Sequence, residues 1–524
     1  MDDTGVAHGT GIGIGAPTRR YEDPRLLRGL GRYVDDMRVP GQAHMAVLRS
    51  PFAAARILGI DAAAARAAPG VLAALTGADL AADGIGPLRT SVQRKQRDGT
   101  AMPEPLFHVL AQEAARFVGD AVAIVIADTP AQAQDASELV DVRYEPLPAV
   151  TDAAEALEPG APAVWPDLAP DNLCFVFPLG GKAATDAAFA AADHVAALDF
   201  RVTRVSANSM ETRNALAIFD PIEQRYTLHS GVQAPHKLRS EIAEKSLHVA
   251  QSRLRVNSPD MGGGFGMKGS PYPEHVLALW AARRVGRPVR WVAGRRAGHA
   301  ARKAESASRG LLRGIGVVDA IEIAAGPFRA PNEEAAEIRF DPGGDATILV
   351  GTHNHGQGHE TAFRQIAHSM LGLDPARVRV VCGDTDTVMH GRGTFGSRSV
   401  IAVGAAMTRA TERIVRRGRA IAAHMLEAAE GDIEFAGGMF RIAGTDRALR
   451  IEEVARQLRG RPGSEGRRAR PRRAIRGRRR RGQLAERRNP HCASVRLNRS
   501  MANSFRSLDH GRGSRGSPLI LNRP

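Results

Sequence analysis

Gly351-Thr-His-Asn-His-Gly-Gln-Gly-His-Glu360 is the stretch around which this 524-residue chain is organised. The residues before it, 346–350, are apolar and partly β-branched, a pattern that predicts a buried strand. After it, apolar side chains recur at helical spacing from Phe363 to Leu371, and 378–381 predicts the next strand. The glycines therefore lie where a strand turns into a helix N-terminus. Its free N–H groups and positive dipole end favour an anion such as phosphate.

Polar side chains of the same loop, Gln357, His359 and Glu360, add hydrogen-bond donors and acceptors beside these N–H groups. A surface turn with incidental histidines is the alternative that the loop alone leaves open, because glycine-rich turns are common. Together with His353 and His355, the loop also suggests a metal site. It lacks the second histidine of a zinc-protease helix, and no cysteine pair lies near, so we expect no metal bound directly by these side chains.

A second glycine-rich loop, Met261-Gly-Gly-Gly-Phe-Gly-Met-Lys268, lies in the same kind of setting. It follows an alternating strand pattern at 253–257 and precedes a helix that should begin at Pro273 and end before Gly286. Consecutive glycines allow positive φ angles and a close approach of the backbone to a ligand. The spacing fits neither the phosphate-binding loop of nucleoside triphosphatases nor the dinucleotide-binding G-x-G-x-x-G pattern.

Strand and helix patterns alternate upstream of both loops. Residues 117–126 predict a strand bent at Gly119, 131–140 a helix and 142–146 the returning strand. This order indicates an α/β unit, and the whole chain a mixed α+β and α/β fold. The three cysteines lie far apart, so we expect neither a disulfide framework nor an iron–sulfur cluster on this chain. No membrane-spanning run or secretory signal is evident, which favours a cytoplasmic location.

Several motifs in a fixed order resemble one known family. They are Gly356-Gln-Gly-His-Glu360 before a helix, Gly383-Asp-Thr-Asp386, Gly393-Thr-Phe-Gly-Ser-Arg-Ser399 and the loop 261–268. Together they resemble the molybdopterin-binding large subunits of the xanthine dehydrogenase and aldehyde oxidase family, and most of all its bacterial carbon monoxide dehydrogenase branch. Segments between 49 and 148 resemble the N-terminal hammerhead domain of that family.

The resemblance implies roles for individual residues. In the family, the loop matching Gly263, Gly264, Phe265 and Gly266 faces the molybdenum, and the glutamine matching Gln233 lies within hydrogen-bonding reach of an oxo ligand. The segments that hold the pterin and its nucleotide tail match Gln357, Gly358, His359, Glu360, Thr394, Gly396, Ser397, Arg398 and Ser399. Taken alone, a glutamine before a turn is usually a capping or solvated residue. Glu211 and Arg213 match a family element near the cofactor, although the residues alone favour a structural ion pair between them.

These matches predict a domain organisation with two breaks. It comprises a flexible N-terminus (1–16), a hammerhead domain (17–150), a linker (151–170), a truncated first molybdopterin-binding domain (171–294), an aberrant junction (295–312), a partial second molybdopterin-binding domain (313–460) and an arginine-rich disordered tail (461–524). At the junction the resemblance resumes further along the family pattern, so an active-site loop of the Ala-Tyr-Arg-Gly kind is expected to be missing. In the tail, the family's Gly-x-Gly-Glu motif, whose glutamate is the general base, finds no match.

The tail carries the excess positive charge of the chain. Residues 461–524 contain 19 arginines, no lysine and three acidic residues, which accounts for the formal net charge of +16. Such an arm can bind nucleic acid by neutralising phosphates, which gives the alternative of a non-enzymatic nucleic-acid-binding protein. A shifted reading frame of a GC-rich gene yields a similar composition, and the abrupt change within a domain favours that origin. Either origin predicts a disordered tail.

The activity that the resemblance implies is oxidative hydroxylation of a small molecule, namely an aldehyde, an N-heterocycle or a substrate like carbon monoxide. The cofactor is expected as molybdenum bound to molybdopterin cytosine dinucleotide. Its electrons would leave through 2Fe–2S clusters and FAD on an iron–sulfur subunit and an FAD subunit, in a dimer of heterotrimers. Because the glutamate and the active-site loop find no match, we expect a chain that keeps parts of the cofactor cradle but has impaired activity or none.

Overall fold

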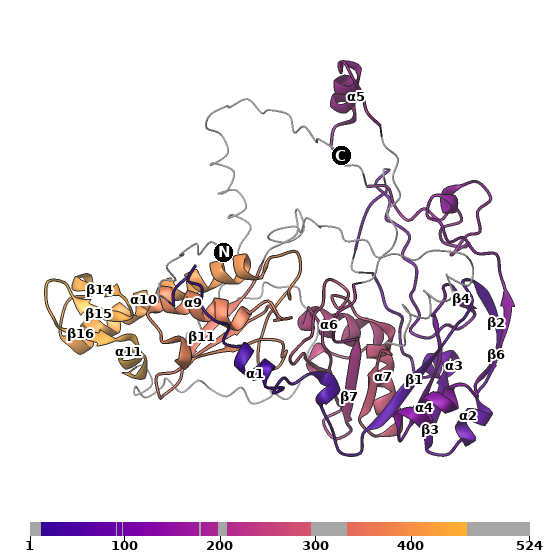
Figure 1. The fold of residues 1–524 in the computed structure, drawn as a ribbon, viewed down its shortest axis with the longest axis horizontal. Helices are drawn as coiled ribbons and strands as arrows, with labels where there is room; N and C mark the ends of the chain where they lie inside the picture. The colour runs from indigo at the N-terminus through magenta and orange to yellow at the C-terminus, as the bar shows by residue number, and fades with distance from the viewer. Residues whose placement is uncertain are drawn as a thin grey trace, which may run out of the picture.

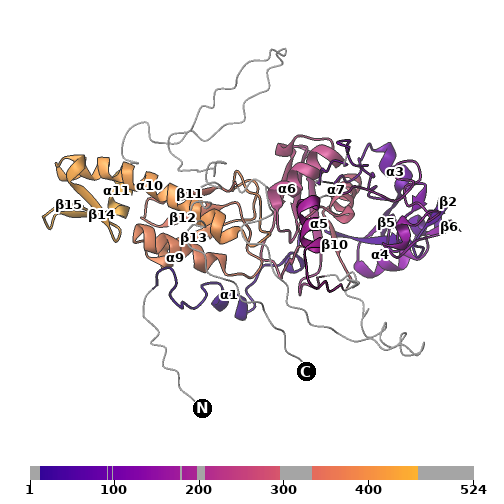
Figure 2. The ribbon, with the colours of Figure 1, turned by 90° about the horizontal axis from the view of Figure 1, so that it is seen from above.

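The computed structural model describes residues 12–90, 92–96, 98–177, 180–197, 207–294 and 333–457. Two bodies of secondary structure lie side by side in both Figure 1 and Figure 2. The first contains the strands up to β10, and the second contains β11 to β16. The N-terminal segment with α1 (Asp23–Leu27) lies at the junction of the two bodies in both views.

One seven-stranded sheet forms the centre of the first body. β1 pairs in parallel with β10, with Ala43 opposite Val289, so strands from both predicted N-terminal domains share this sheet. The predicted boundary at 151–170 stays a prediction. In spatial order the strands are β3 (Val71–Thr76), β5 (Ala121–Ala127), β1 (Ala43–Arg49), β10 (Val289–Val292), β7 (Asn214–Asp220), β8 (Arg225–His229) and β9 (Leu254–Asn257).

The sequences of β5 and α7 (Pro273–Val285) explain this core. β5 reads Ala-Val-Ala-Ile-Val-Ile-Ala and is buried along its whole length, as a continuous apolar run predicts. α7 packs on β7 and buries ten of its 13 residues. Pro273 begins this helix and Gly286, with a φ of +65°, ends it, as the sequence predicts.

Smaller elements surround the large sheet. β4 (Ala114–Ala115), β2 (Ala55–Asp61) and β6 (Asp141–Pro146) form a three-stranded sheet. The helices are α2 (Ala63–Ala67), α3 (Gly77–Ala82), α4 (Pro130–Ser137), α5 (Lys182–Ala190) and α6 (Pro235–Ser240), the last followed by a π-helical turn, Glu241–Ser246. α5 rises away from the sheet in Figure 1, and none of its residues is buried.

The second body is built around the loop 351–360. In its first sheet, β11 (Ala336–Phe340), β12 (Ala346–Val350) and β13 (Val378–Val381) lie in this order, and β12 is parallel to β13. α9 (His359–Leu371) connects the two parallel strands, which gives a strand–helix–strand crossover. The long α10 (Ser399–Leu426) packs on α9 and on β14 (Ile433–Ala436), which pairs with β15 (Met439–Ile442) and through it with β16 (Ala448–Arg450) before α11 (Ile451–Gln457).

The structure confirms the mixed fold and the strands and helices that flank both glycine loops, but it corrects two boundaries. The strand predicted over 117–126 begins only at Ala121, because the chain turns at Gly119, whose φ is +96°. The helix predicted over 131–140 ends at Ser137, whose hydroxyl donates to the Gln134 carbonyl at 2.7 Å and competes with the helical hydrogen bonds.

Parts of the predicted organisation fall outside the described residues. They are positions 1–11 of the predicted flexible N-terminus, 198–206 of the first predicted cofactor-binding domain, the junction 295–312, 313–332 and 458–460 of the second predicted domain, and the tail 461–524. Within the described ranges, no helix combines the length and the apolar character that crossing a bilayer requires.

Candidate cofactor-binding site

The loop between β12 and α9 has the geometry that its glycines predict. Gly356 and Gly358 have φ angles of +109° and +81°, and Gly358 is the N-cap of α9. Gln357 is exposed, His359 is buried and Glu360 is partly buried, so the predicted pterin-binding residues lie in the turn before the helix and in its first two positions. The pattern of a strand, a tight glycine turn and a helix is confirmed.

An internal carboxylate fills the anion position at the N-terminus of α9. Glu22, 1% exposed, accepts hydrogen bonds from the Glu360 N–H at 2.9 Å and from the Thr361 hydroxyl at 2.6 Å. The sequence predicts a bound anion such as phosphate here, whereas at this N–H group the chain itself supplies a carboxylate, from 338 residues upstream of Glu360. Burial raises the pKa of Glu360, and the charge of Glu22 raises it further. The N–H group that bonds to Glu22 is not available to a phosphate.

The three histidines of this loop are neutral at physiological pH. Burial lowers the pKa of His353 and of His359 to about 4, and that of His355 to about 2. His353 Nε2 lies 2.9 Å from Ser258 Oγ, which belongs to the first body. His355 Nε2 and His359 Nδ1 are buried without a hydrogen-bond partner in the protein. In the part of the chain that the structure describes, no three His, Cys, Asp or Glu side chains are arranged to hold a metal ion.

The loop 261–268 depends on its glycines for close approach. Gly263 and Gly266 have φ angles of +92° and +84°, and Phe265 between them has +49°. A Cβ atom at Gly264 would lie 2.8 Å from the side chain of Gln233, so a larger residue would displace that side chain. The Phe265 side chain is 75% exposed, and it lies on the surface of the loop.

A buried ion pair between Lys268 and Glu211 anchors the loop 261–268. Lys268, 2% exposed, places Nζ 2.8 Å from Glu211 Oε2, and the same oxygen accepts the Gly262 N–H at 3.1 Å. The predicted pair between Glu211 and Arg213 is wrong, because Arg213 instead pairs with Glu274 at 3.1 Å. Burial lowers the pKa of Lys268, and the hydrogen bond to Glu211 partly restores it. Glu211 therefore holds the loop rather than reaching a ligand.

Gln233 connects the loop 261–268 to the segment 394–399. Its side-chain Nε2 donates to the Thr394 carbonyl at 3.0 Å, and its Oε1 accepts the Lys268 N–H at 3.2 Å. Backbone bonds to the same two residues, both 2.9 Å long, reinforce the connection. Gln233 is 4% exposed, so it is neither a solvated nor a simple capping residue. Its contact with a molybdenum ligand stays a prediction.

Thr394 connects Gln233 and the loop 261–268 to the other glycine loop, 351–360. Its hydroxyl donates to the His353 carbonyl at 2.7 Å and accepts the His353 N–H at 2.9 Å. Ser399 Oγ donates to this hydroxyl at 3.1 Å. The structure thus brings Gln233, Thr394, Ser399 and the two glycine loops into one network.

The rest of the segment 394–399 divides into buried and exposed residues. Arg398 is fully buried and pairs with Glu334 at 2.6 Å, so its guanidinium points into the second body. Gly396 and Ser397, with φ angles of +54° and +47°, turn the chain into α10, and Ser397 is exposed. Arg398 therefore positions the segment, whereas Ser397 lies where a ligand can reach it.

Ion pairs fasten the two bodies to each other beside this network. Asp384 accepts two hydrogen bonds from Arg255 at 3.1 and 2.8 Å, and Asp386 accepts two from Arg225 at 2.8 and 2.7 Å. The motif that contains both aspartates therefore joins the second body to β8 and β9.

Sequence reasoning missed four side chains that shape the site: Glu22, Asp260, Lys268 and Glu334. Of these, only Lys268 gave a local signal in the sequence, because it stands at the end of a glycine loop.

These residues fit a flat, polar heterocycle such as a pterin. Buried polar atoms without partners are costly unless a ligand satisfies them, and three lie within residues 351–360: Thr352 Oγ1, His355 Nε2 and His359 Nδ1. A pterin offers several ring nitrogens and N–H groups that can satisfy such atoms. The glycines of both loops add backbone that a ligand can approach closely.

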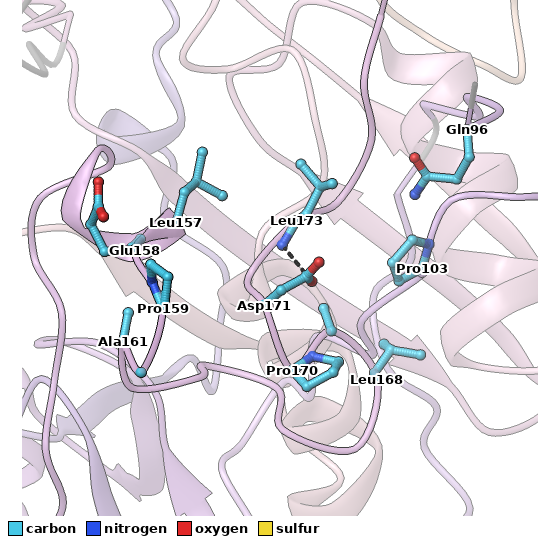
Figure 3. A pocket seen from close by; sticks show the side chains of 13 residues that line it. Gln96, Pro103, Leu157, Glu158, Pro159, Ala161, Leu168, Pro170, Asp171 and Leu173 are labelled. Atoms are coloured by element: carbon cyan, nitrogen blue, oxygen red, sulfur yellow. Dashed lines mark hydrogen bonds between the residues drawn. The ribbon is translucent and has the colours of Figure 1, made fainter. Parts of the chain in front are cut away.

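A separate pocket lies away from these loops. It has a volume of about 630 Å³ and is lined by Gln96, Pro103, 156–161, 168–171 and Leu173 (Figure 3). Its Asp171 carboxylate accepts the Leu173 N–H at 3.1 Å. None of the lining residues belongs to the two glycine loops or to 394–399, so this pocket is distinct from the candidate site.

Comparisons with known proteins agree with the sequence motifs. The family model of the aldehyde oxidase and xanthine dehydrogenase a/b hammerhead domain matches residues 28–148. Two models of a molybdopterin cofactor-binding domain match 166–312 and 292–482. The two glycine loops thus fall in two different cofactor-binding matches.

Curated relatives and solved structures are similar over most of their length. The carbon monoxide dehydrogenase large chain of Hydrogenophaga pseudoflava is 30% identical, over 81% of this chain and 73% of the relative. The nicotine 6-hydroxylase large subunit of Paenarthrobacter nicotinovorans is 27% identical, over 84% and 74%. The structure of a Cu,Mo-CO dehydrogenase superposes with a TM-score of 0.73 at 27% identity, over 85% of this chain and 77% of that one. Quinoline 2-oxidoreductase from Pseudomonas putida 86 gives 0.70 at 26% identity, over 84% and 76%.

The alignment with the Hydrogenophaga pseudoflava chain also contains many gap positions. It runs over 601 positions, yet 81% of the 524 residues of this chain is about 424, which leaves about 177 positions of the relative without a counterpart. The two cofactor-binding matches meet at 292–312, where the sequence predicts a missing segment.

Proposed function

This chain belongs to the family of molybdopterin-binding large subunits that includes carbon monoxide dehydrogenase and xanthine dehydrogenase, and on that premise we propose which of its residues hold the cofactor. It is the molybdenum-cofactor subunit of a molybdenum-dependent oxidoreductase of the hydroxylase type. We propose that three segments form the cradle: 263–266, 357–360 and 394–399. The finer assignment of individual residues is the part that needs an experiment.

One observation carries this proposal. Gln233 bonds to Thr394 at 3.0 Å and to the Lys268 N–H at 3.2 Å, and Thr394 bonds to His353 at 2.7 Å. The side chains of Gln233 and Thr394 and the backbone of Lys268 and His353 are therefore tied in one buried network that joins all three proposed segments. Because these groups are held in place before a ligand binds, little ordering is left for the binding step.

Each segment has a distinct task in this proposal. Gly263, Gly264 and Gly266 let the backbone of the first loop approach the molybdenum end, and the exposed Phe265 ring covers it from water. Gln357, Gly358, His359 and Glu360 contact the pterin. Thr394, Gly396, Ser397 and Ser399 line the pterin and its nucleotide tail, while Arg398 positions them through Glu334. When bound, the molybdenum supplies the oxidative hydroxylation chemistry.

We further propose that the cofactor is the cytosine dinucleotide form and that electrons leave through an iron–sulfur subunit and an FAD subunit, in a dimer of heterotrimers. The relatives support a multi-subunit assembly, because their names describe a "large chain", a "large subunit" and a "complex subunit". The substrate class proposed is an aldehyde, an N-heterocycle or a substrate like carbon monoxide. Relatives named for nicotine and for carbon monoxide support this range.

Impaired turnover also stays part of the proposal. The gaps in the alignment support a missing internal segment, and the expected active-site loop has no match in this sequence. The junction 295–312 and the tail 461–524 lie outside the described residues, so neither the loop nor the general base is placed by the structure. Cofactor binding and turnover therefore have to be measured separately.

The test is the cofactor content of the full chain purified after co-expression with iron–sulfur and FAD subunits. We expect molybdenum and released pterin in near-equal amounts in the unchanged chain. Gly264→Ala should lose most of both, because its methyl group would lie 2.8 Å from the Gln233 side chain. Gly343→Ala is the matched control, since a Cβ atom there meets nothing within 4 Å. Equal pterin content in the two variants would overturn the assignment of the loop 263–266 to the cofactor cradle.

A further inference from the structure

Two residues at the start of α1 contact different glycine loops. Glu22 is the N-cap of α1 and bonds to the start of α9, as described above. Arg25, three residues later, bonds to Asp260, the residue that precedes the loop 261–268. One short turn of helix therefore reaches both cofactor-binding loops, which lie in different bodies.

The contact beside the loop 261–268 is a bidentate ion pair between Arg25 and Asp260. Arg25 Nη2 donates to Asp260 Oδ1 at 2.8 Å, and Nη1 donates to Oδ2 of the same carboxylate. The Arg32 N–H also donates to this carboxylate, at 2.7 Å. Burial alone would raise the pKa of Asp260, but the hydrogen bonds from Arg25 and Arg32 hold it below its usual value. Asp260 thus stays ionised and fully bonded across the physiological pH range.

The segment is also anchored beyond both of these contacts. On the N-terminal side, Gln365 Nε2 of α9 donates to the carbonyls of Gly13 and Ala16 at 3.1 and 3.0 Å. On the C-terminal side, the buried Arg290 of β10 donates to the Val34 carbonyl at 2.6 Å. The chain from 13 to 34 is therefore fixed to both bodies, and little slack is left between Glu22 and Arg25.

We propose that the segment 20–32 is a clamp that fixes the two glycine loops relative to each other, and that retention of the cofactor depends on it. This inference rests on the proposed function for its cofactor part only. Glu22 and Arg25 are positioning residues, since they contact the loops and not the ligand. Because both residues lie on one short turn, loss of either contact breaks the connection that this turn makes between the two loops. The N-terminal segment is then part of the cradle and not only part of the hammerhead architecture.

Amide hydrogen exchange on the full chain without cofactor tests the clamp independently of the proposed function. In Arg25→Gln, we expect the Glu360 amide, whose hydrogen bond goes to Glu22 and not to Arg25, to exchange about tenfold faster, the factor that corresponds to about 1.4 kcal/mol of lost interaction. In Glu22→Gln, the amides of 261–268 should accelerate in the same way. Arg25→Lys keeps the charge but loses the two-pronged geometry, so its effect should be intermediate. Unchanged exchange at the distant loop in all three variants would overturn the proposal.

Two variants of the same turn serve as matched controls. Asp23→Asn removes a carboxylate whose ion pair with Arg20, at 3.5 Å, is exposed and therefore weak, and Arg28→Gln removes an exposed guanidinium whose Nε donates to the nearby Pro24 carbonyl at 2.9 Å. Both should leave exchange in the two loops unchanged. The double variant Glu22→Gln, Arg25→Gln should be no faster than either single one, since either change alone opens the clamp. Additive effects would mean two independent contacts and would refute a clamp.

Cofactor retention completes the test. After co-expression with partner subunits and dialysis, the fluorescence of released pterin should fall about tenfold faster in Arg25→Gln than in Arg28→Gln, in line with the exchange result. Equal retention in these two variants would contradict the cofactor part of the inference. If the unchanged chain holds no pterin at all, the proposed function fails, and hydrogen exchange alone decides whether the clamp exists.

Discussion

Replacing Lys268 by methionine is the change whose cost the structure defines best. Lys268 and Glu211 are buried, 2.8 Å apart, and once the ammonium is gone Glu211 keeps two neutral donors among the described residues, the Gly262 N–H and the Asn214 amide. Removing one partner of a buried ion pair leaves an uncompensated charge, which costs about 3–5 kcal/mol. The double variant Lys268→Met, Glu211→Gln leaves no charge and should lose only about 1–2 kcal/mol.

Urea unfolding at pH 7 measures both values. Trp280 and Trp291 are buried in the core of the first body, so their fluorescence follows the unit that contains this ion pair. The expected order of unfolding midpoints is the unchanged chain, then the double variant, then Lys268→Met, with equal slopes against urea. A single variant within about 1 kcal/mol of the unchanged chain would refute the reasoning. A double variant less stable than the single one would refute it as well.

Three further changes follow from the same network and its surroundings. Thr394→Val removes the hydroxyl that joins His353 to Ser399 and should cost about 1–3 kcal/mol of stability in the second body, measured by thermal unfolding against Thr445→Val at an exposed turn. Arg398→Met leaves Glu334 buried without its partner and should cost about 3–5 kcal/mol, whereas Arg398→Met with Glu334→Gln should recover most of it. Acid should weaken the fold below pH 6.5, because burial depresses the pKa of each buried histidine and the unfolded chain then binds protons that the folded chain does not. Each such histidine should lower the free energy of unfolding by about 1.4 kcal/mol per pH unit. His275→Gln removes a histidine whose pKa is about 4. This variant should therefore show a smaller dependence of the free energy of unfolding on pH, measured from pH 7.5 to 5.5.

Local sequence patterns predicted the elements that carry the site. The strand before each glycine loop and the helix after it depend on apolar periodicity and on turn residues within about ten positions, which a single sequence contains. Pro273 and Gly286 marked the ends of α7 correctly for the same reason. The bend at Gly119 was predicted, but the strand was expected to continue through it, because an apolar run on both sides of a glycine fits a bent strand as well as a turn.

Long-range partners could not be predicted from the same patterns. Glu22 lies 338 residues from the amide that it caps, and Arg25 lies 235 residues from Asp260. Nothing near an acidic residue in the sequence shows which distant donor it will meet. The error at Glu211 has this origin: Arg213 was the nearest cation along the chain, but Lys268 was the nearest in space. The sequence shows which charged groups are available, but only tertiary packing determines which of them pair.

We propose that the two glycine loops and 394–399 hold one molybdenum cofactor between them. The most direct measurement is an anomalous difference map, recorded at the molybdenum absorption edge from crystals of the chain purified with its partner subunits. We predict a single strong peak beside Gly264 and Gln233, with pterin density reaching the loop 357–360. Crystals of a folded chain with no peak at these loops, or with the peak at another place, would contradict the account.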